Sequence, residues 1–126
     1  MLKTATLTAE CLQNMTDTIV SEVDPDKVIL FGSHARGEAN QQSDVDLLVV
    51  TTQPFGPQNS RRGMAARLGR SLSRFLIPTD ILLYTTEEVE AWQGSRNHVI
   101  TQAMKEGQVL YERSRSGQGS TASSLS

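Results

Sequence analysis

Apolar residues recur at two spacings along this chain, and the two spacings separate helices from strands. Leu12, Met15, Ile19 and Val23 follow one another every three or four positions, which predicts an amphipathic helix over residues 8–23. Short apolar runs bounded by turn residues predict strands instead. The other predicted elements are strands at 27–31, 44–50, 79–84 and 109–111, helices at 60–76, 86–93 and 96–106, and a short helix near residue 34. This order predicts an α/β (α+β) fold with a small mixed β-sheet flanked by helices.

The composition changes near residue 114. Residues 114–126 are rich in Ser and Gly and hold one apolar residue, Leu125, so they bury too little surface to offset the entropy of ordering. We expect a single folded domain over residues 1–113 and a disordered tail over 114–126. A chain of 126 residues is too short for two ordinary domains.

Composition narrows the class of protein. A net charge of −2 argues against a surface built for nucleic acid, so we expect no direct nucleic-acid partner. No segment reaches the roughly 20 apolar residues that span a bilayer, and the first residues do not form a signal peptide. Cys11 is the single cysteine, which excludes an intrachain disulfide. We expect a cytoplasmic protein that does not engage a membrane.

Positive charge is concentrated in one segment. Residues 58–76 contain five arginines and no acid, whereas the whole chain has 12 basic and 14 acidic residues. Arg67, Arg70 and Arg74 share one face of the predicted helix. Two interpretations stay open: this face docks an acidic partner or steers a negatively charged substrate, or it is a solvated face that pairs with the chain's own acids.

Two acids interrupt an apolar run in the predicted strand 44–50. Asp44 and Asp46 are two positions apart, so they point to one face with Cα atoms roughly 6.6 Å apart. Two carboxylates this close repel each other unless a cation lies between them, and Mg²⁺ prefers such hard oxygen ligands. The alternative is an edge strand whose acids face solvent.

A third acid has a similar setting. Asp80 is the one charged residue in the run 77–84, and a carboxylate among such neighbours is tolerated beside a metal or another cation. Asp44, Asp46 and Asp80 could together hold two Mg²⁺ ions about 3.5–4 Å apart, the arrangement used in phosphoryl and nucleotidyl transfer.

A Gly-Ser pair precedes these acids. Gly32 and Ser33 follow a predicted strand and open a short helix, a setting in which backbone N–H groups and a hydroxyl can bind phosphate. Arg36 is a further candidate phosphate contact, and its alternative role is a surface ion pair with Glu38 or another acid.

Gly32-Ser33, ten intervening residues and then Asp44-Val45-Asp46 resemble the pattern of the polymerase-β-like nucleotidyltransferases. The longer segment over residues 31–50 is similar to the minimal nucleotidyltransferases and reads FGSHARGEANQQSDVDLLVV. Minimal nucleotidyltransferases are single-domain bacterial proteins often encoded beside a HEPN-domain partner. The resemblance covers roughly residues 10–112. This chain has His34 where family members often have arginine.

The resemblance implies a role for each motif residue. Gly32 and Ser33 would bind the triphosphate of ATP, and Asp44 and Asp46 would ligate two Mg²⁺ ions. Asp80 would match the third carboxylate, near the acceptor hydroxyl, where it can serve as general base. The implied activity is transfer of AMP from ATP to a tyrosine of a HEPN ribonuclease toxin, for which the chain would be the antitoxin.

Two other functions stay open. In one, the chain neutralises its partner by binding alone, without catalysis. In the other, it is a nucleotidyltransferase for a small molecule of the aminoglycoside type.

Overall fold

The computed structural model describes residues 7–39, 44–57, 60–92 and 99–113 of the chain. The predicted tail at 114–126 lies outside these ranges, as do residues 93–98 between the last two predicted helices. The elements are α1 (Ala9–Val23), β1 (Lys27–Phe31), α2 (Ser33–Arg36), β2 (Val45–Thr51), α3 (Arg61–Leu72), the 3₁₀ turn η1 (Ser73–Phe75), β3 (Thr79–Thr85), α4 (Thr86–Trp92), α5 (Val99–Glu106) and β4 (Gln108–Glu112). Every predicted element is therefore present, with shifted ends.

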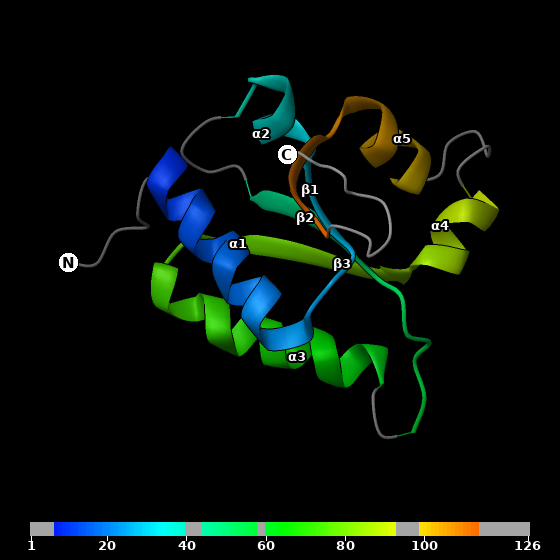
Figure 1. Ribbon diagram of the computed structural model, residues 1–126. Helices are drawn as coiled ribbons and strands as arrows, with labels where there is room; N and C mark the ends of the chain where they lie inside the picture. Colours follow the sequence, from blue (N-terminus) through cyan, green and yellow to red (C-terminus); the bar gives the residue numbers. More distant parts are fainter. Residues whose placement is uncertain (1–6, 40–43, 58–59, 93–98, 114–126) are drawn as a thin grey trace, which may run out of the picture.

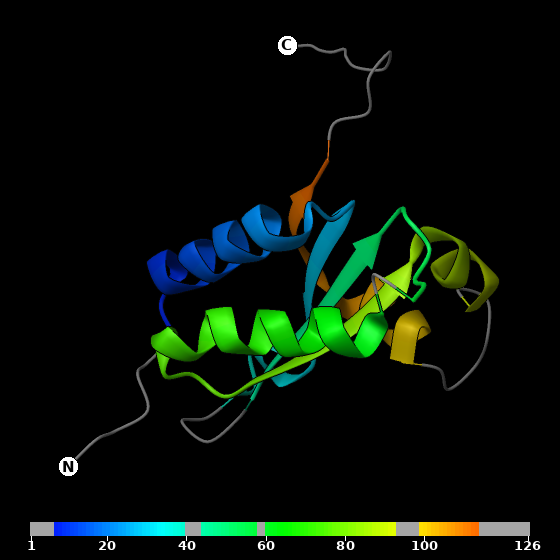
Figure 2. The same ribbon diagram turned by 90° about the horizontal axis from the view of Figure 1, so that it is seen from below.

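The strands form one four-stranded mixed sheet in the order β3-β2-β1-β4. β2 and β3 are parallel, whereas β1 is antiparallel to both β2 and β4. Parallel strands need a crossover connection, and α3 supplies it between β2 and β3. The views in Figures 1 and 2 show α1 and α3 side by side on one face of the sheet, with α4 and α5 toward the other. The expected fold class is confirmed.

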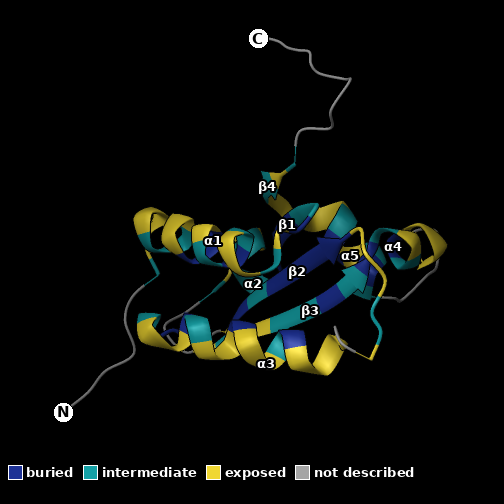
Figure 3. Cartoon of the chain, turned by 60° about the horizontal axis from the view of Figure 1, so that its bottom comes forward, coloured by how far each residue is buried: buried dark blue, intermediate teal, exposed yellow. Residues whose placement is uncertain are grey.

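Each sheet face has its own apolar core. Met15 and Ile19 of α1 and Leu68 of α3 pack with one set of strand residues, whereas Val89 of α4 and Ile100 of α5 pack with the other. Figure 3 shows the resulting dark band of buried residues along β2. No helix in the described ranges is long and apolar enough to cross a membrane.

The ends of α1 follow from its flanking residues. The Thr8 side chain accepts a hydrogen bond of 3.0 Å from the Cys11 N–H, which satisfies one of the free donors at the helix start. Asp24 adopts a left-handed conformation at φ 48° and ends the helix before Pro25. The helix predicted over residues 8–23 is therefore confirmed, with its first residue at Ala9.

The helix predicted over 60–76 changes character before its end. Its α-helical part stops at Leu72, and the chain continues as η1 and then turns at Leu76 with φ 59°. Met64, Leu68 and Leu72 are buried as the pattern predicts, and Phe75 packs against the same core. Leu76, the alternative member of this stripe, is 53% exposed.

Candidate functional site

Strand register brings two of the predicted acids together. Asp46 pairs with Asp80 across the parallel strands β2 and β3, and with Phe31 across the antiparallel strands β1 and β2. Residues paired in adjacent strands point to the same face, on backbones about 4.8 Å apart. The carboxylates of Asp46 and Asp80 therefore project from neighbouring positions on one sheet face.

The surroundings of the three acids differ. β2 lies between β1 and β3, and Asp46 is its one residue that is not fully buried. The edge-strand alternative for this pair of acids is therefore wrong. Asp44 is exposed and precedes the strand, which begins at Val45 rather than at residue 44 as predicted. Asp80 is also exposed, and it lies on the edge strand β3.

The Gly-Ser turn presses against the central acid. Gly32 has φ 76° and ψ −156°, a conformation that essentially only glycine adopts. A Cβ atom at this position would lie 2.2 Å from Asp46 Oδ2, so glycine alone leaves room for the carboxylate. The turn predicted to bind phosphate and the strand predicted to bind metal are thus in direct contact.

The helix after this turn is a single turn, α2, which begins at Ser33. So short a helix has little macrodipole, and the phosphate-binding groups it can offer are local ones. The first N–H of a helix has no acceptor inside the helix. Ser33, as the first helical residue, offers its hydroxyl together with that N–H directly after Gly32, the residue that packs against Asp46.

Burial and like charge both act on Asp46. Its pKa is raised above the ordinary value, first by desolvation and then by repulsion from Asp80 and Asp44. His34 and Arg36 act in the opposite direction through their positive charge. These five side chains therefore interact electrostatically. The attraction from His34 and Arg36 is too weak to offset the burial of Asp46 and its repulsion from the other two acids.

The donor set suits a hard divalent cation. Within the described ranges, no three His, Cys, Asp or Glu side chains are arranged as a ready metal cage. Mg²⁺ does not require such a cage, because it commonly takes one or two carboxylates and completes its shell with water and substrate phosphates. The register pair of Asp46 and Asp80, with Asp44 close by, fits that mode of binding.

Arg36 forms ion pairs within the chain, as its alternative role predicts. Its Nε donates to Glu38 Oε1 at 2.9 Å, and its Nη1 donates to Glu106 Oε1 at 3.3 Å. These two hydrogen bonds raise the pKa of Arg36. Glu106 is the last residue of α5, 70 residues away, and no sequence pattern pointed to it.

Two of the three arginines on the basic face contact α1. Arg67 pairs with the Glu22 carboxylate at 3.4 Å and donates to the Glu22 carbonyl at 3.0 Å. Arg74 donates to Thr18 Oγ1 at 2.9 Å and lies over the ring of Phe75. These contacts favour the interpretation that the basic face pairs within the chain.

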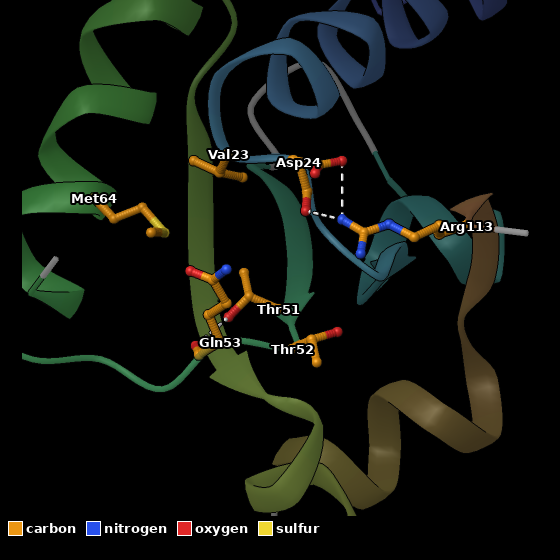
Figure 4. Close-up of a pocket in the computed structure, with 7 residues that line it drawn as sticks. All are labelled: Val23, Asp24, Thr51, Thr52, Gln53, Met64 and Arg113. Carbon is orange, nitrogen blue, oxygen red and sulfur yellow. Dashed lines mark hydrogen bonds and ion pairs between the residues drawn. The ribbon is translucent and has the colours of Figure 1, made fainter. Parts of the chain in front are cut away.

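A cavity of about 150 Å³ lies at the opposite end of β2 from Asp46. Figure 4 shows Thr51, Gln53 and Met64 at its wall, with Arg113 paired to Asp24. The one acid that lines it is thus already neutralised by an arginine. This cavity lacks the paired carboxylates and the glycine turn that mark the candidate site.

Comparisons with known proteins bear on this arrangement. The family model described as "Polymerase beta, Nucleotidyltransferase" matches residues 13–116. No curated protein matches the chain.

Three solved structures have a related fold. A protein of Sulfolobus solfataricus with a provisional nucleotidyltransferase assignment has a TM-score of 0.51 at 20% identity, over 82% of this chain and 79% of that chain. A toxin–antitoxin with AMP-PNP has a TM-score of 0.52 at 20% identity, over 80% of this chain and 73% of that chain. A mutant of the MntA–HpeT toxin–antitoxin has a TM-score of 0.50 at 17% identity, over 80% and 73%. At identities this low, the structural likeness shows a shared fold alone.

Proposed function

Because the chain belongs to the polymerase beta nucleotidyltransferase family, we propose that it is a Mg²⁺-dependent protein adenylyltransferase. It moves AMP from ATP to a tyrosine hydroxyl of a HEPN ribonuclease toxin and thereby acts as the antitoxin. One observation carries the proposal: Asp46 and Asp80 are register partners, and Gly32 packs against the Asp46 carboxylate. This combination supports our assignment of the Gly32 turn to phosphate binding and of the two acids to metal binding.

Asp46 and Asp80 differ in exposure, and this difference supports a different role for each. Asp46 is partly buried against the Gly32 turn, so it belongs to the triphosphate side of the site. Asp80 is exposed on the edge strand β3, where an acceptor from another molecule can reach it. Asp80 therefore accepts the proton of the acceptor hydroxyl, and Ser33 and Arg36 hold the phosphates.

The reaction is a displacement at the α-phosphorus. A bond forms between the acceptor oxygen and the α-phosphorus, and the bond from that phosphorus to the bridging oxygen breaks. The hydroxyl proton passes to the Asp80 carboxylate, and pyrophosphate leaves. Asp44, Asp46 and Asp80 would hold the Mg²⁺, which when bound supplies positive charge for the phosphate oxygens and acidifies the acceptor hydroxyl.

The toxin partner is supported by the resemblance of the motif and by the related folds. Two of the related structures are toxin–antitoxins, and one of them contains AMP-PNP. The exposure of Asp80 on the edge strand β3 also favours an acceptor that a second macromolecule delivers.

The test combines the chain, Mg²⁺, ATP and the product of the neighbouring gene, which we expect to be the HEPN protein, and looks for AMP additions by intact-mass spectrometry. We expect the native chain to add AMP to the HEPN protein, and Asp46→Asn to add none. Asp17→Asn is the control, because Asp17 is an exposed acid on α1 that accepts a hydrogen bond from Gln13 Nε2 at 2.9 Å, away from the candidate site. Equal addition by native and Asp46→Asn protein would contradict the proposal.

The same variants separate the other two functions. If Asp46→Asn still binds the HEPN protein and still protects cells from it, the chain is a binding antitoxin. If the chain releases pyrophosphate with an aminoglycoside and no protein partner, it is a small-molecule nucleotidyltransferase.

A further inference from the structure

The carboxyl end of α5 packs tightly against β1, the strand that ends directly before the Gly32 turn. A Cβ atom on Gly107 would lie 2.3 Å from the Ala103 carbonyl oxygen and 2.4 Å from Ile29 Cγ2. The Gly107 N–H also donates to the Ala103 carbonyl at 2.9 Å. Only glycine permits this approach, and it places Glu106 at a fixed position beside α2.

Glu106 and Glu38 reach Arg36 from two directions. Glu38 accepts from Nε at 2.9 Å, and Glu106 accepts from Nη1 at 3.3 Å. A guanidinium has five N–H donors in a rigid plane, so two carboxylates that fix two of its nitrogens also fix the direction of the third. The Arg36 side chain remains 40% exposed, which leaves room for a further acceptor.

Arg36 also contacts the Gly32 turn of the candidate site through its backbone. Arg36 lies on the single-turn helix α2, and its backbone N–H donates at 3.1 Å to the carbonyl of Gly32, the residue that packs against the Asp46 carboxylate. Polyphosphate oxygens are strong acceptors for a guanidinium that still has donors to offer.

We propose that Glu106, together with Glu38, is a positioning residue that holds the Arg36 guanidinium ready for the terminal phosphates of a nucleoside triphosphate. This proposal rests on the proposed function of the site and adds α5 to it. Glu106 does not touch the substrate and acts through Arg36. The Glu106 carboxylate repels phosphate to some extent, but the gain in phosphate binding from a pre-ordered Arg36 guanidinium is larger than this repulsion.

The test is a double-mutant cycle on phosphate binding. Binding of magnesium tripolyphosphate and of magnesium ATP is measured by calorimetry for the native chain, Arg36→Ala, Glu106→Ala and the double variant. We expect Arg36→Ala to weaken binding about 10- to 100-fold, as for a lost hydrogen bond to a charged group. Glu106→Ala should weaken it about three- to fivefold, as for a half-exposed ion pair, and should have no further effect once Arg36 is absent.

Glu112→Ala is the matched control, because Glu112 pairs with Lys27 at 3.6 Å at the far end of the same β1 strand. Its binding should equal that of the native chain. Thermal denaturation of all variants shows that each is folded. In the transfer assay, Glu106→Ala should raise the KM for ATP and leave kcat within about twofold, which a general loss of structure would not do.

Three outcomes would overturn the positioning role. Tighter binding by Glu106→Ala would mean that Glu106 competes with phosphate for Arg36. Additive effects of the two substitutions would mean that Glu106 acts independently, and no tripolyphosphate binding by the native chain would remove the phosphate role of Arg36. Coupled tripolyphosphate binding without AMP transfer would instead preserve the positioning role and contradict the proposed function.

Discussion

Replacing Gly32 by alanine tests the contact between the phosphate turn and the metal-binding strand. The new Cβ would lie 2.2 Å from Asp46 Oδ2 and 3.1 Å from its Cγ, so the Asp46 side chain or the turn must move. The backbone at φ 76° and ψ −156° is also one that alanine does not accept. Both costs fall on the candidate site itself.

The size of the effect follows from these two costs. The backbone conformation costs about 1–3 kcal/mol, and an off-rotamer Asp46 about 0.5–1.5 kcal/mol. The sum is about 1.5–4.5 kcal/mol, or a fall in Tm of about 6–18 °C for a domain of this size. A shift of about 1 Å in a positioned group costs about 100-fold in rate, so AMP transfer should fall at least that far.

Gly37→Ala is the matched control. Gly37 has nearly the same φ, 75°, but a Cβ there would meet no atom within 4 Å. It should lose about 1–2 kcal/mol of stability from the left-handed backbone and keep most of its transfer activity. The assays are thermal denaturation and the rate of AMP transfer below the Tm of both variants. Equal loss of activity in the two variants, or a fully active Gly32→Ala, would refute the contact as the cause.

Three further predictions concern stability. Leu76→Gly should raise the free energy of unfolding by about 0.5–1 kcal/mol in urea titrations, because Leu76 has φ 59° and glycine relieves that strain at a smaller entropic cost. Hydrogen bonds from Thr85 and a pair with Arg61 outweigh desolvation and lower the pKa of Glu88 below its ordinary value of 4.5. The contribution of Glu88 to the free energy of unfolding is therefore present above pH 4.5 and is lost as pH falls through the lowered pKa. In an acid titration, Glu88→Gln should therefore lose less stability than the native chain. Because the pKa of Asp46 is raised, Asp46→Asn should raise the Tm at pH 7 without metal, and added Mg²⁺ should raise the Tm of the native chain but not of this variant.

Local patterns in the sequence were sufficient to predict the elements. The four-residue spacing of Met64, Leu68 and Leu72 predicts α3, and these residues are buried. The end of that helix was less predictable, because Phe75 and Leu76 both continue the apolar stripe and only the left-handed turn at Leu76 decides between them. The start of α4 is marked in the sequence by a capping-box motif, because Thr85 and Glu88 form reciprocal hydrogen bonds.

The candidate site was less accessible from sequence, because sheet order decides it. The spacing of Asp44 and Asp46 predicted a shared face, but not that β2 is central or that Asp80 is its register partner. The contact of Arg36 with Glu106 joins residues 70 apart and depends on how α5 packs on β1. Such pairings come from tertiary packing and leave no periodic pattern in the chain.

The central claim is that Asp46 and Asp80 form the site of nucleotidyl transfer. The most direct measurement follows ATP labelled at the α-phosphate in the presence of Mg²⁺ and the HEPN protein, and records the label on protein together with pyrophosphate release. The account predicts that native chain and Asp17→Asn transfer the label with equal release of pyrophosphate, and that Asp46→Asn and Asp80→Asn do neither. Label transfer that survives both of the latter substitutions would contradict it.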